Sequence, residues 1–173
     1  MSNQPLDAKR IPLSQGYFAV VDASDYDWLM QWKWSAMVVP NIVYAKRTRR
    51  KSEVGSRGLV LMHREIMAPC SGIIDHKDRI GLHNWRSNLR DCTQTENSRN
   101  SRKRRGATSK YLGVSWHKGD DAWHAKIGLH GKVLHLGCYG DEIAAARAYD
   151  AAARKHFGEF ANPNFDDLRA GAE

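Results

Sequence analysis

Short runs of apolar and β-branched residues, separated by clusters of turn residues, dominate the chain and predict more strands than helices. In the first half, strands are expected on either side of a Ser-Gln-Gly turn within 11–21, and again over 42–48 and 59–62. Apolar residues at helical spacing within 25–34 predict a short helix, although the alternation of Trp32, Lys33 and Trp34 indicates that a strand has begun by then, and the boundary between them stays open. A second, short helix is expected over 63–67. The first half is therefore expected to be a small α+β unit.

The second half predicts three strands, 111–117, 122–129 and 132–137, followed by an alanine-rich helix from Asp141 to about His156. Since side chains alternate along a strand, one face of this sheet is expected to be apolar and to pack on the helix. The opposite face is expected to be polar or cationic. It receives Ser115, His117, His124, Lys126 and His135, flanked by Lys118 and Lys132.

Composition narrows the choice of partners and compartment. The net charge is +8 and the pI is about 9.6, which favours a polyanion, although an acidic substrate would fit the same sign. The three cysteines are far apart and form no C-x-x-C pair, which argues against both a disulfide framework and a structural zinc held by cysteines. A reducing compartment is therefore expected. Neither a membrane span nor a secretory signal is visible, so an intracellular monomer without a membrane partner is expected.

The stretch from Ile73 to Asn97 carries the candidate chemistry of the first half. Ile73 and Ile74 can end a strand that presents Asp75 and His76 at the rim of a cleft, and 89–92 reads as the return strand. The residues Thr93-Gln94-Thr95-Glu96 form a capping-box pattern that opens a helix and places Asn97 in its first turn. The pattern predicts a compact strand-loop-strand-helix unit.

These residue types suit metal-assisted hydrolysis of a phosphodiester. His76 can be the general base, while Asp75 and Asn97 can hold one divalent metal, Mg²⁺ or alternatively Mn²⁺. Asn88 would orient His76 or brace the loop. Asn84 is a rival for the role of Asn88, and His83 for that of His76; taken singly, the asparagines also read as ordinary loop and cap residues.

The pattern D-H-x(11)-N-x(8)-N, with R-S-N-L-R and T-Q-T-E-N around it, resembles the HNH homing endonucleases of bacteriophages, whose catalytic fold is called ββα-metal. K-R-I-P-L-S-Q-G-Y-F-A-V-V-D and W-K-W-S-A extend the resemblance back to about Lys9. It implies that His76 activates water, that Asp75 and Asn97 bind the metal, and that Asn88 is the middle Asn of the motif.

The motifs Y-L-G-V-S-W, W-H-A-K-I, H-L-G-C-Y and A-A-A-R-A-Y-D-A-A-A resemble the APETALA2 or ethylene-response-factor DNA-binding domain over 111–165. The resemblance implies that the outer face of the sheet enters the major groove. The chain is thus expected to have an N-terminal unit over 1–97, whose nuclease core covers about 59–97, and a basic linker over 98–110. The DNA-binding domain follows over 111–165, and a tail covers 166–173. Phosphate contacts are expected from the linker residues Arg102, Lys103, Arg104 and Arg105.

The sequence thus predicts an α+β protein of two modules, an HNH endonuclease that cuts double-stranded DNA with a divalent metal, located in the host cytoplasm if it is encoded by a phage. The alternative is a DNA-binding or regulatory protein whose nuclease site is degenerate and cuts nothing.

Overall fold

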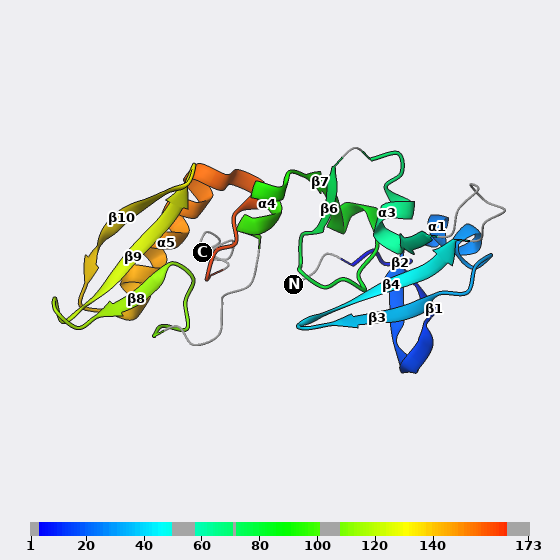
Figure 1. Ribbon diagram of the computed structural model, residues 1–173, viewed down its shortest axis with the longest axis horizontal. Helices are drawn as coiled ribbons and strands as arrows, with labels where there is room; N and C mark the ends of the chain where they lie inside the picture. Colours follow the sequence, from blue (N-terminus) through cyan, green and yellow to red (C-terminus); the bar gives the residue numbers. More distant parts are fainter. Residues whose placement is uncertain (1–3, 50–57, 71, 101–107, 166–173) are drawn as a thin grey trace. The chain divides into compact units, whose positions relative to one another are not determined.

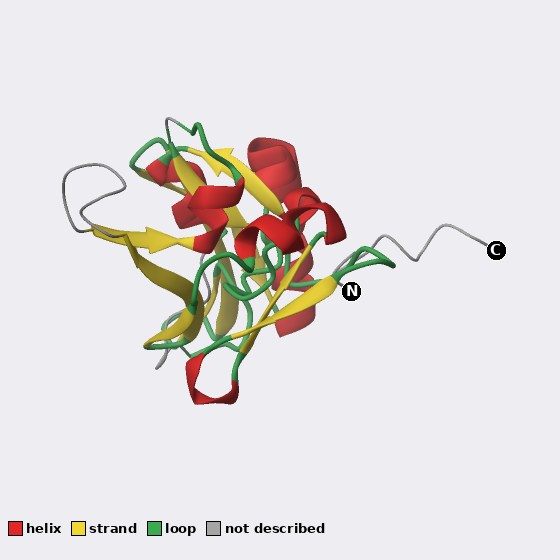
Figure 2. Cartoon of the chain, turned by 90° about the vertical axis from the view of Figure 1, so that its right-hand side faces the viewer, coloured by secondary structure: helices red, strands yellow, loops and turns green. Residues whose placement is uncertain are grey.

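The computed structural model describes residues 4–49, 58–70, 72–100 and 108–165. Contacts divide the chain into two units, Met1–Asn97 and Ser98–Glu173, and each is described by itself (Figure 1). Figure 2 shows strands joined mainly by loops, with few helices, and every pair of named strands is antiparallel. The predicted α+β class is confirmed at this level.

The first unit begins with two small antiparallel sheets. Strand β1 (Lys9–Pro12) pairs with β2 (Phe18–Val21) around a 3-10 turn at Ser14–Gly16. Strands β3 (Ser35–Val39), β4 (Ile42–Arg49) and β5 (Gly58–Leu61) form the second sheet in that order, and α3 (Met62–Ile66) follows directly. The strands predicted within 11–21 and over 42–48 and 59–62 are all present.

The short helix predicted within 25–34 is present, and a strand follows it. Helix α1 spans Ala23–Leu29, and Trp34 turns back and donates its indole N–H to the Leu29 carbonyl at 2.8 Å. The Trp34 ring is buried in the core of the unit. This bond satisfies a carbonyl at the helix end and allows β3 to begin at Ser35. The core of the unit contains Ile11, Ala19, Val21, Leu29, Trp34, Ala45, Val60, Met62, Ile66, Ile74 and Leu89.

The last part of the first unit is a hairpin followed by a helix. Strand β6 (Ile73–His76) pairs with β7 (Leu89–Cys92), with a 3-10 turn at Arg86–Asn88 before β7. Helix α4 (Gln94–Arg99) comes next and runs across the boundary between the units. The predicted order of strand, loop, strand and helix is therefore present.

The second unit is a three-stranded sheet with one long helix against it (Figure 1). Strands β8 (Val114–His117), β9 (Ala122–Leu129) and β10 (Lys132–Tyr139) lie in the order β10-β9-β8. Helix α5 (Glu142–Phe157) is capped by Asp141, whose Oδ2 accepts the Ala144 N–H at 2.8 Å. The side chains buried between helix and sheet are mostly small, which allows a close approach: Val114, Ala125, Ile127, Ala145, Ala146, Ala153 and Phe157.

A buried carboxylate fixes the chain that follows α5. Asp150 is fully buried, and its two oxygens accept hydrogen bonds from the backbone and side-chain N–H groups of Asn164 and from the Phe165 N–H, at 2.7 to 2.9 Å. Asn164 in turn bonds the backbone of Leu112. The segment after the helix is thus tied to the segment before the sheet. Among the described residues, none of the helices is both long enough and apolar enough to cross a membrane.

Candidate nucleic-acid interface and the predicted catalytic hairpin

A capping box holds the turn between β7 and α4, as the sequence predicted. The Thr93 N–H and hydroxyl both donate to Glu96 Oε2 at 2.8 Å, and the Glu96 N–H donates back to the Thr93 hydroxyl at 3.3 Å. Asn97 lies on α4, with its N–H bonded to the Thr93 carbonyl. The local elements that would carry the predicted chemistry are therefore correct.

The carboxylate of Asp75 is occupied by a guanidinium. Asp75 Oδ2 accepts from Arg90 Nη2 at 2.8 Å and from Arg90 Nε at 3.0 Å, and both side chains are buried. The two residues are also register partners across the β6–β7 hairpin. A cation bound at Asp75 would lie beside a buried positive charge, which is electrostatically unfavourable.

His76 is held inside the hairpin. It is 4% exposed, and its Nε2 lies 3.3 Å from Asn84 Oδ1. Burial lowers the pKa of His76, although the Asn84 hydrogen bond and the nearby Asp78 and Asp75 carboxylates oppose the shift. The His63 ring lies 4.9 Å from the His76 ring, centroid to centroid, and burial lowers the pKa of His63 to about 3. Both imidazoles are therefore neutral bases in a poorly solvated place.

Asn88 braces the loop that joins β6 to β7. Its Nδ2 donates to Asp78 Oδ1 at 3.0 Å and to the His83 carbonyl at 2.9 Å, and its Oδ1 accepts the Asp78 N–H at 3.2 Å. His83 Nδ1 lies 2.6 Å from the other Asp78 oxygen. Of the two roles considered for Asn88, bracing the loop is the one these contacts describe, and Asn84 is the asparagine that contacts His76.

The outer face of the second unit's sheet, opposite α5, gathers polar side chains from all three strands. Ser115 of β8 and Cys138 of β10 are both register partners of His124 in β9, and His135 is the partner of Lys126. His117, Lys126 and His135 are exposed on this face, whereas His124 is 7% exposed among its neighbours. Lys118 and Lys132 lie at the flanks, and Arg102, Lys103, Arg104 and Arg105 fall outside the described residues.

Strict alternation holds in β8 and β9 and fails in β10. His135 pairs with Lys126 but Gly137 pairs with Ala125, so a β-bulge adds one residue at Leu136. The bulge brings Cys138, three residues after His135, onto the outer face. Sequence reasoning placed no function on Cys138; the His-x-x-Cys spacing was the available signal. Leu134, the register partner of the buried Ile127, is 45% exposed on edge strand β10.

No family model matches the chain. Among curated proteins, the ethylene-responsive transcription factor WRI1 of Arabidopsis thaliana is 45% identical over 60 residues, which is 34% of this chain and 14% of that protein. The AP2-like ethylene-responsive transcription factor ANT of the same plant is 46% identical over 67 residues, 38% of this chain and 12% of its own length. APETALA2-like protein 2 of Oryza sativa subsp. japonica is 39% identical over 71 residues, 38% of this chain and 16% of its own length.

The chain thus spans less than a fifth of the length of these curated relatives. The likeness supports an AP2-like domain, the class predicted for 111–165, and the sheet with one helix is compatible with it. More than half of the chain lies outside each match.

The prediction that the protein is an HNH endonuclease is wrong. The relatives are named as transcription factors, which are not nucleases, and nothing found here supports a ββα-metal nuclease domain or phosphodiester hydrolysis. The roles given to His76 and Asn88 presupposed that reaction and are not taken further. The divalent metal at Asp75 and Asn97 stays an untested prediction, and the Asp75–Arg90 pair disfavours it.

Proposed function

We propose that the protein is a DNA-binding regulatory protein, whose second unit contacts double-stranded DNA through the outer face of β8–β9–β10. The similarity to AP2-like transcription factors carries this proposal. The net charge of +8 agrees with a polyanionic partner. A protein that acts on DNA works inside the cell, and we propose that location for it.

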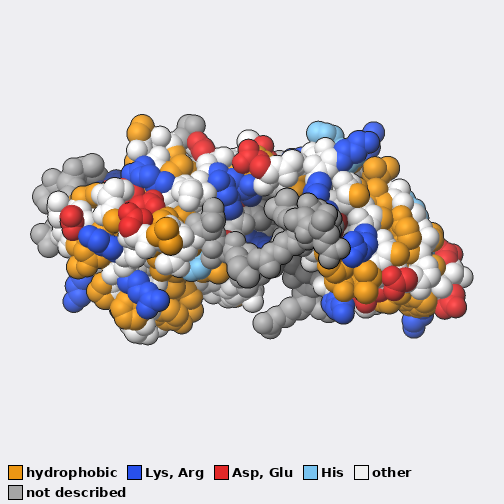
Figure 3. Space-filling view, turned by 180° about the vertical axis from the view of Figure 1, so that it is seen from behind, with side chains coloured by type: hydrophobic (Ala, Val, Ile, Leu, Met, Phe, Trp, Pro, Cys, Tyr) orange, Lys and Arg blue, Asp and Glu red, His pale blue; other side chains and the backbone are white. Residues whose placement is uncertain are grey.

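The outer face of the β8–β9–β10 sheet is chosen as the binding surface on grounds other than the net charge of the chain. On the side seen in Figure 3, Lys and Arg side chains are spread among acidic and hydrophobic ones and do not form one continuous patch. Charge alone therefore selects no binding site. Helix α5 covers the opposite face of the sheet and leaves the outer face uncovered by it. The outer face combines the exposed Lys126 with hydroxyl and imidazole groups that can donate to phosphates and base edges.

Direct contacts are assigned to the exposed side chains of this face. Lys126 lies in the central strand β9, and we propose that it contacts a phosphate. His117 and His135 lie on the strands to either side of it. His124, largely covered, is assigned a supporting position beneath them. Ser115, Lys118, Lys132 and the basic residues 102–105 remain predicted contacts.

The test is DNA binding by the full chain over a salt series, on a duplex selected from a random library and on an unselected duplex. Lys126→Ala is expected to weaken binding to both duplexes and to lower the slope of log K against log salt by about 1, because one phosphate contact is lost. The matched control is Lys155→Ala, an exposed lysine on α5. Equal losses in both variants, or no binding by the wild type, would overturn the proposed face.

A further inference from the structure

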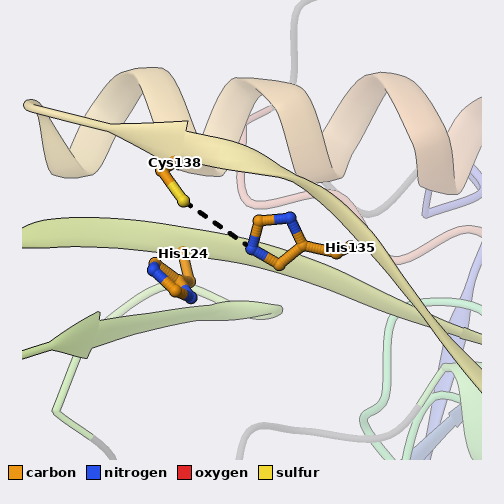
Figure 4. A group of neighbouring side chains, drawn as sticks. All are labelled: His124, His135 and Cys138. Atoms are coloured by element: carbon orange, nitrogen blue, oxygen red, sulfur yellow. Dashed lines mark hydrogen bonds between the residues drawn. The ribbon is translucent and has the colours of Figure 1, made fainter. Parts of the chain in front are cut away.

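Three potential metal ligands meet on the outer face of the second unit. His124 comes from β9, and His135 and Cys138 from β10, and their ligand atoms all lie within 4.8 Å of one another. Figure 4 shows Cys138 and His135 of β10 directed toward one another, with His124 of β9 close by. Cys138 Sγ lies 3.8 Å from His135 Nε2, and the ring centroids of His124 and His135 are 4.9 Å apart.

The backbone explains why these three side chains converge. His124 and Cys138 are cross-strand partners, so they share a face. His135 would point to the other face in a regular strand, since it is three residues from Cys138. The bulge between His135 and Gly137 restores it to the same side. Gly137 has a φ of +136°, a conformation open to glycine and rarely adopted by other residues.

We propose that His124, His135 and Cys138 bind a Zn²⁺ ion, with water or an exogenous ligand in the fourth position. His135 is then a metal ligand and not a DNA contact, and Lys126 and His117 remain the proposed direct contacts of this face. Imidazole nitrogen and thiolate sulfur are both established zinc ligands, and this ion prefers tetrahedral geometry. Zn–N and Zn–S bonds of about 2.05 and 2.3 Å place N and S roughly 3.6 Å apart in a tetrahedron. The 3.8 Å between His135 Nε2 and Cys138 Sγ needs almost no adjustment. Binding releases the thiol proton of Cys138 to solvent.

Asp120 supplies an orienting partner for this site. Its Oδ2 lies 2.6 Å from His124 Nε2, and a carboxylate on one ring nitrogen of a histidine fixes which nitrogen faces a metal. His117, Asp120 and His124 form a second group with suitable spacing that would use the same histidine. The thiolate favours the group with Cys138 for zinc, because Cys sulfur is the softer ligand. The two groups share His124, and Asp120 lies in the turn between β8 and β9.

The site is accessible from solvent, since His135 and Cys138 are exposed in the unit. This exposure also makes the experiment clean, because both residues can be replaced without opening the core between sheet and helix. Co²⁺ is the spectroscopic probe, as it takes tetrahedral thiolate sites and shows a sulfur-to-metal charge-transfer band. Zn²⁺ is then titrated against the Co²⁺ complex, in reducing buffer, with protein that carries no histidine tag.

The wild-type full chain is expected to bind one Co²⁺ with that band and to release it to Zn²⁺. Cys138→Ser is expected to abolish the band. Asp120→Asn is expected to weaken Zn²⁺ binding by about 10- to 100-fold, and His135→Ala to weaken it at least as much. Cys70→Ser and His130→Asn are the matched controls and should bind like wild type; Cys70 lies in the first unit and His130 is an exposed turn residue.

Two results would overturn the proposal. One is a charge-transfer band that survives Cys138→Ser, or no band in the wild type. The other is Zn²⁺ binding that is insensitive to Cys138→Ser and His135→Ala but lost in His117→Ala, which would assign the ion to the second group. Circular dichroism of each variant, recorded without metal, shows that the fold is retained.

Discussion

Acidification is expected to destabilise the first unit through His63. The ring is 5% exposed, and its Nδ1 has no hydrogen-bond partner in the described part of the chain. It packs between the rings of Tyr44 and His76, with centroid distances of 5.5 and 4.9 Å. Protonation would place a charge in this site without a compensating carboxylate. Burial, then the neighbouring His76 and Arg64, lower the pKa of His63 to about 3.

The sign and size of the effect follow from linkage. The unfolded chain binds a proton at His63 near pH 6.5, while the folded chain resists it until about pH 3. Stability is therefore complete above pH 6.5 and is lost as the pH falls from 6.5 towards 3. With about 1.4 kcal/mol for each pH unit, His63 alone removes about 2 kcal/mol of unfolding free energy at pH 5 relative to pH 8. His76 adds to this loss, because burial lowers its pKa as well.

The assay is urea unfolding at pH 8, 7, 6 and 5, followed by tryptophan fluorescence, for the wild type and His63→Asn. The variant cannot titrate at this position, so its unfolding free energy is expected to fall by about 2 kcal/mol less over this range. The transition that responds to the substitution belongs to the first unit. His130→Asn, in an exposed turn, is the control. Identical pH profiles for wild type and His63→Asn would refute the reasoning.

Two further predictions concern the second unit. Gly113→Ala is expected to destabilise it by about 2–4 kcal/mol, because φ is +71° and the added Cβ would collide with the Tyr149 ring. The control Gly128→Ala has open space around its Cβ and should be close to neutral. Thermal unfolding of both variants checks this, and a neutral Gly113→Ala would contradict it. Asp150→Ala is expected to lower the free energy of unfolding by roughly 3–5 kcal/mol, because several N–H donors lose a buried carboxylate acceptor. Asp141→Ala removes only the exposed helix cap and should cost about 1 kcal/mol. Equal losses of the two variants in urea unfolding would argue against the Asp150 network.

Local signals in the sequence predicted the elements well. The Thr93–Glu96 capping box, the Asp141 cap and the turn residues around β1 and β2 determine their structure through hydrogen bonds between residues close in sequence. The boundary between α1 and β3, which the sequence left open, has a different origin. There the Trp34 indole reaches back from the core to the Leu29 carbonyl, a contact which helical spacing does not register.

The sheet face of the second unit shows the same division. Alternation assigned Ser115, His124 and Lys126 to one side correctly, because β8 and β9 are regular. It missed Cys138, because the extra residue of a β-bulge reverses which side chains of a strand face outward, and a single sequence does not reveal where a bulge lies. A glycine with His and Cys around it is the only hint. The proposed zinc site therefore depends on the register, and the residue types alone could not have predicted it.

The hairpin of the first unit shows why a correct local structure did not carry the predicted activity. Asp75 and His76 end a strand, and Asn97 follows a capping box, as the spacing indicated. Their chemistry is set by other partners. Arg90 occupies the Asp75 carboxylate from across the hairpin, and Asn84 contacts the His76 imidazole. A sequence motif determines which side chains lie near one another along the chain. Whether a side chain is available to bind a metal or take up a proton depends on its tertiary neighbours, so the function has to be argued from those neighbours.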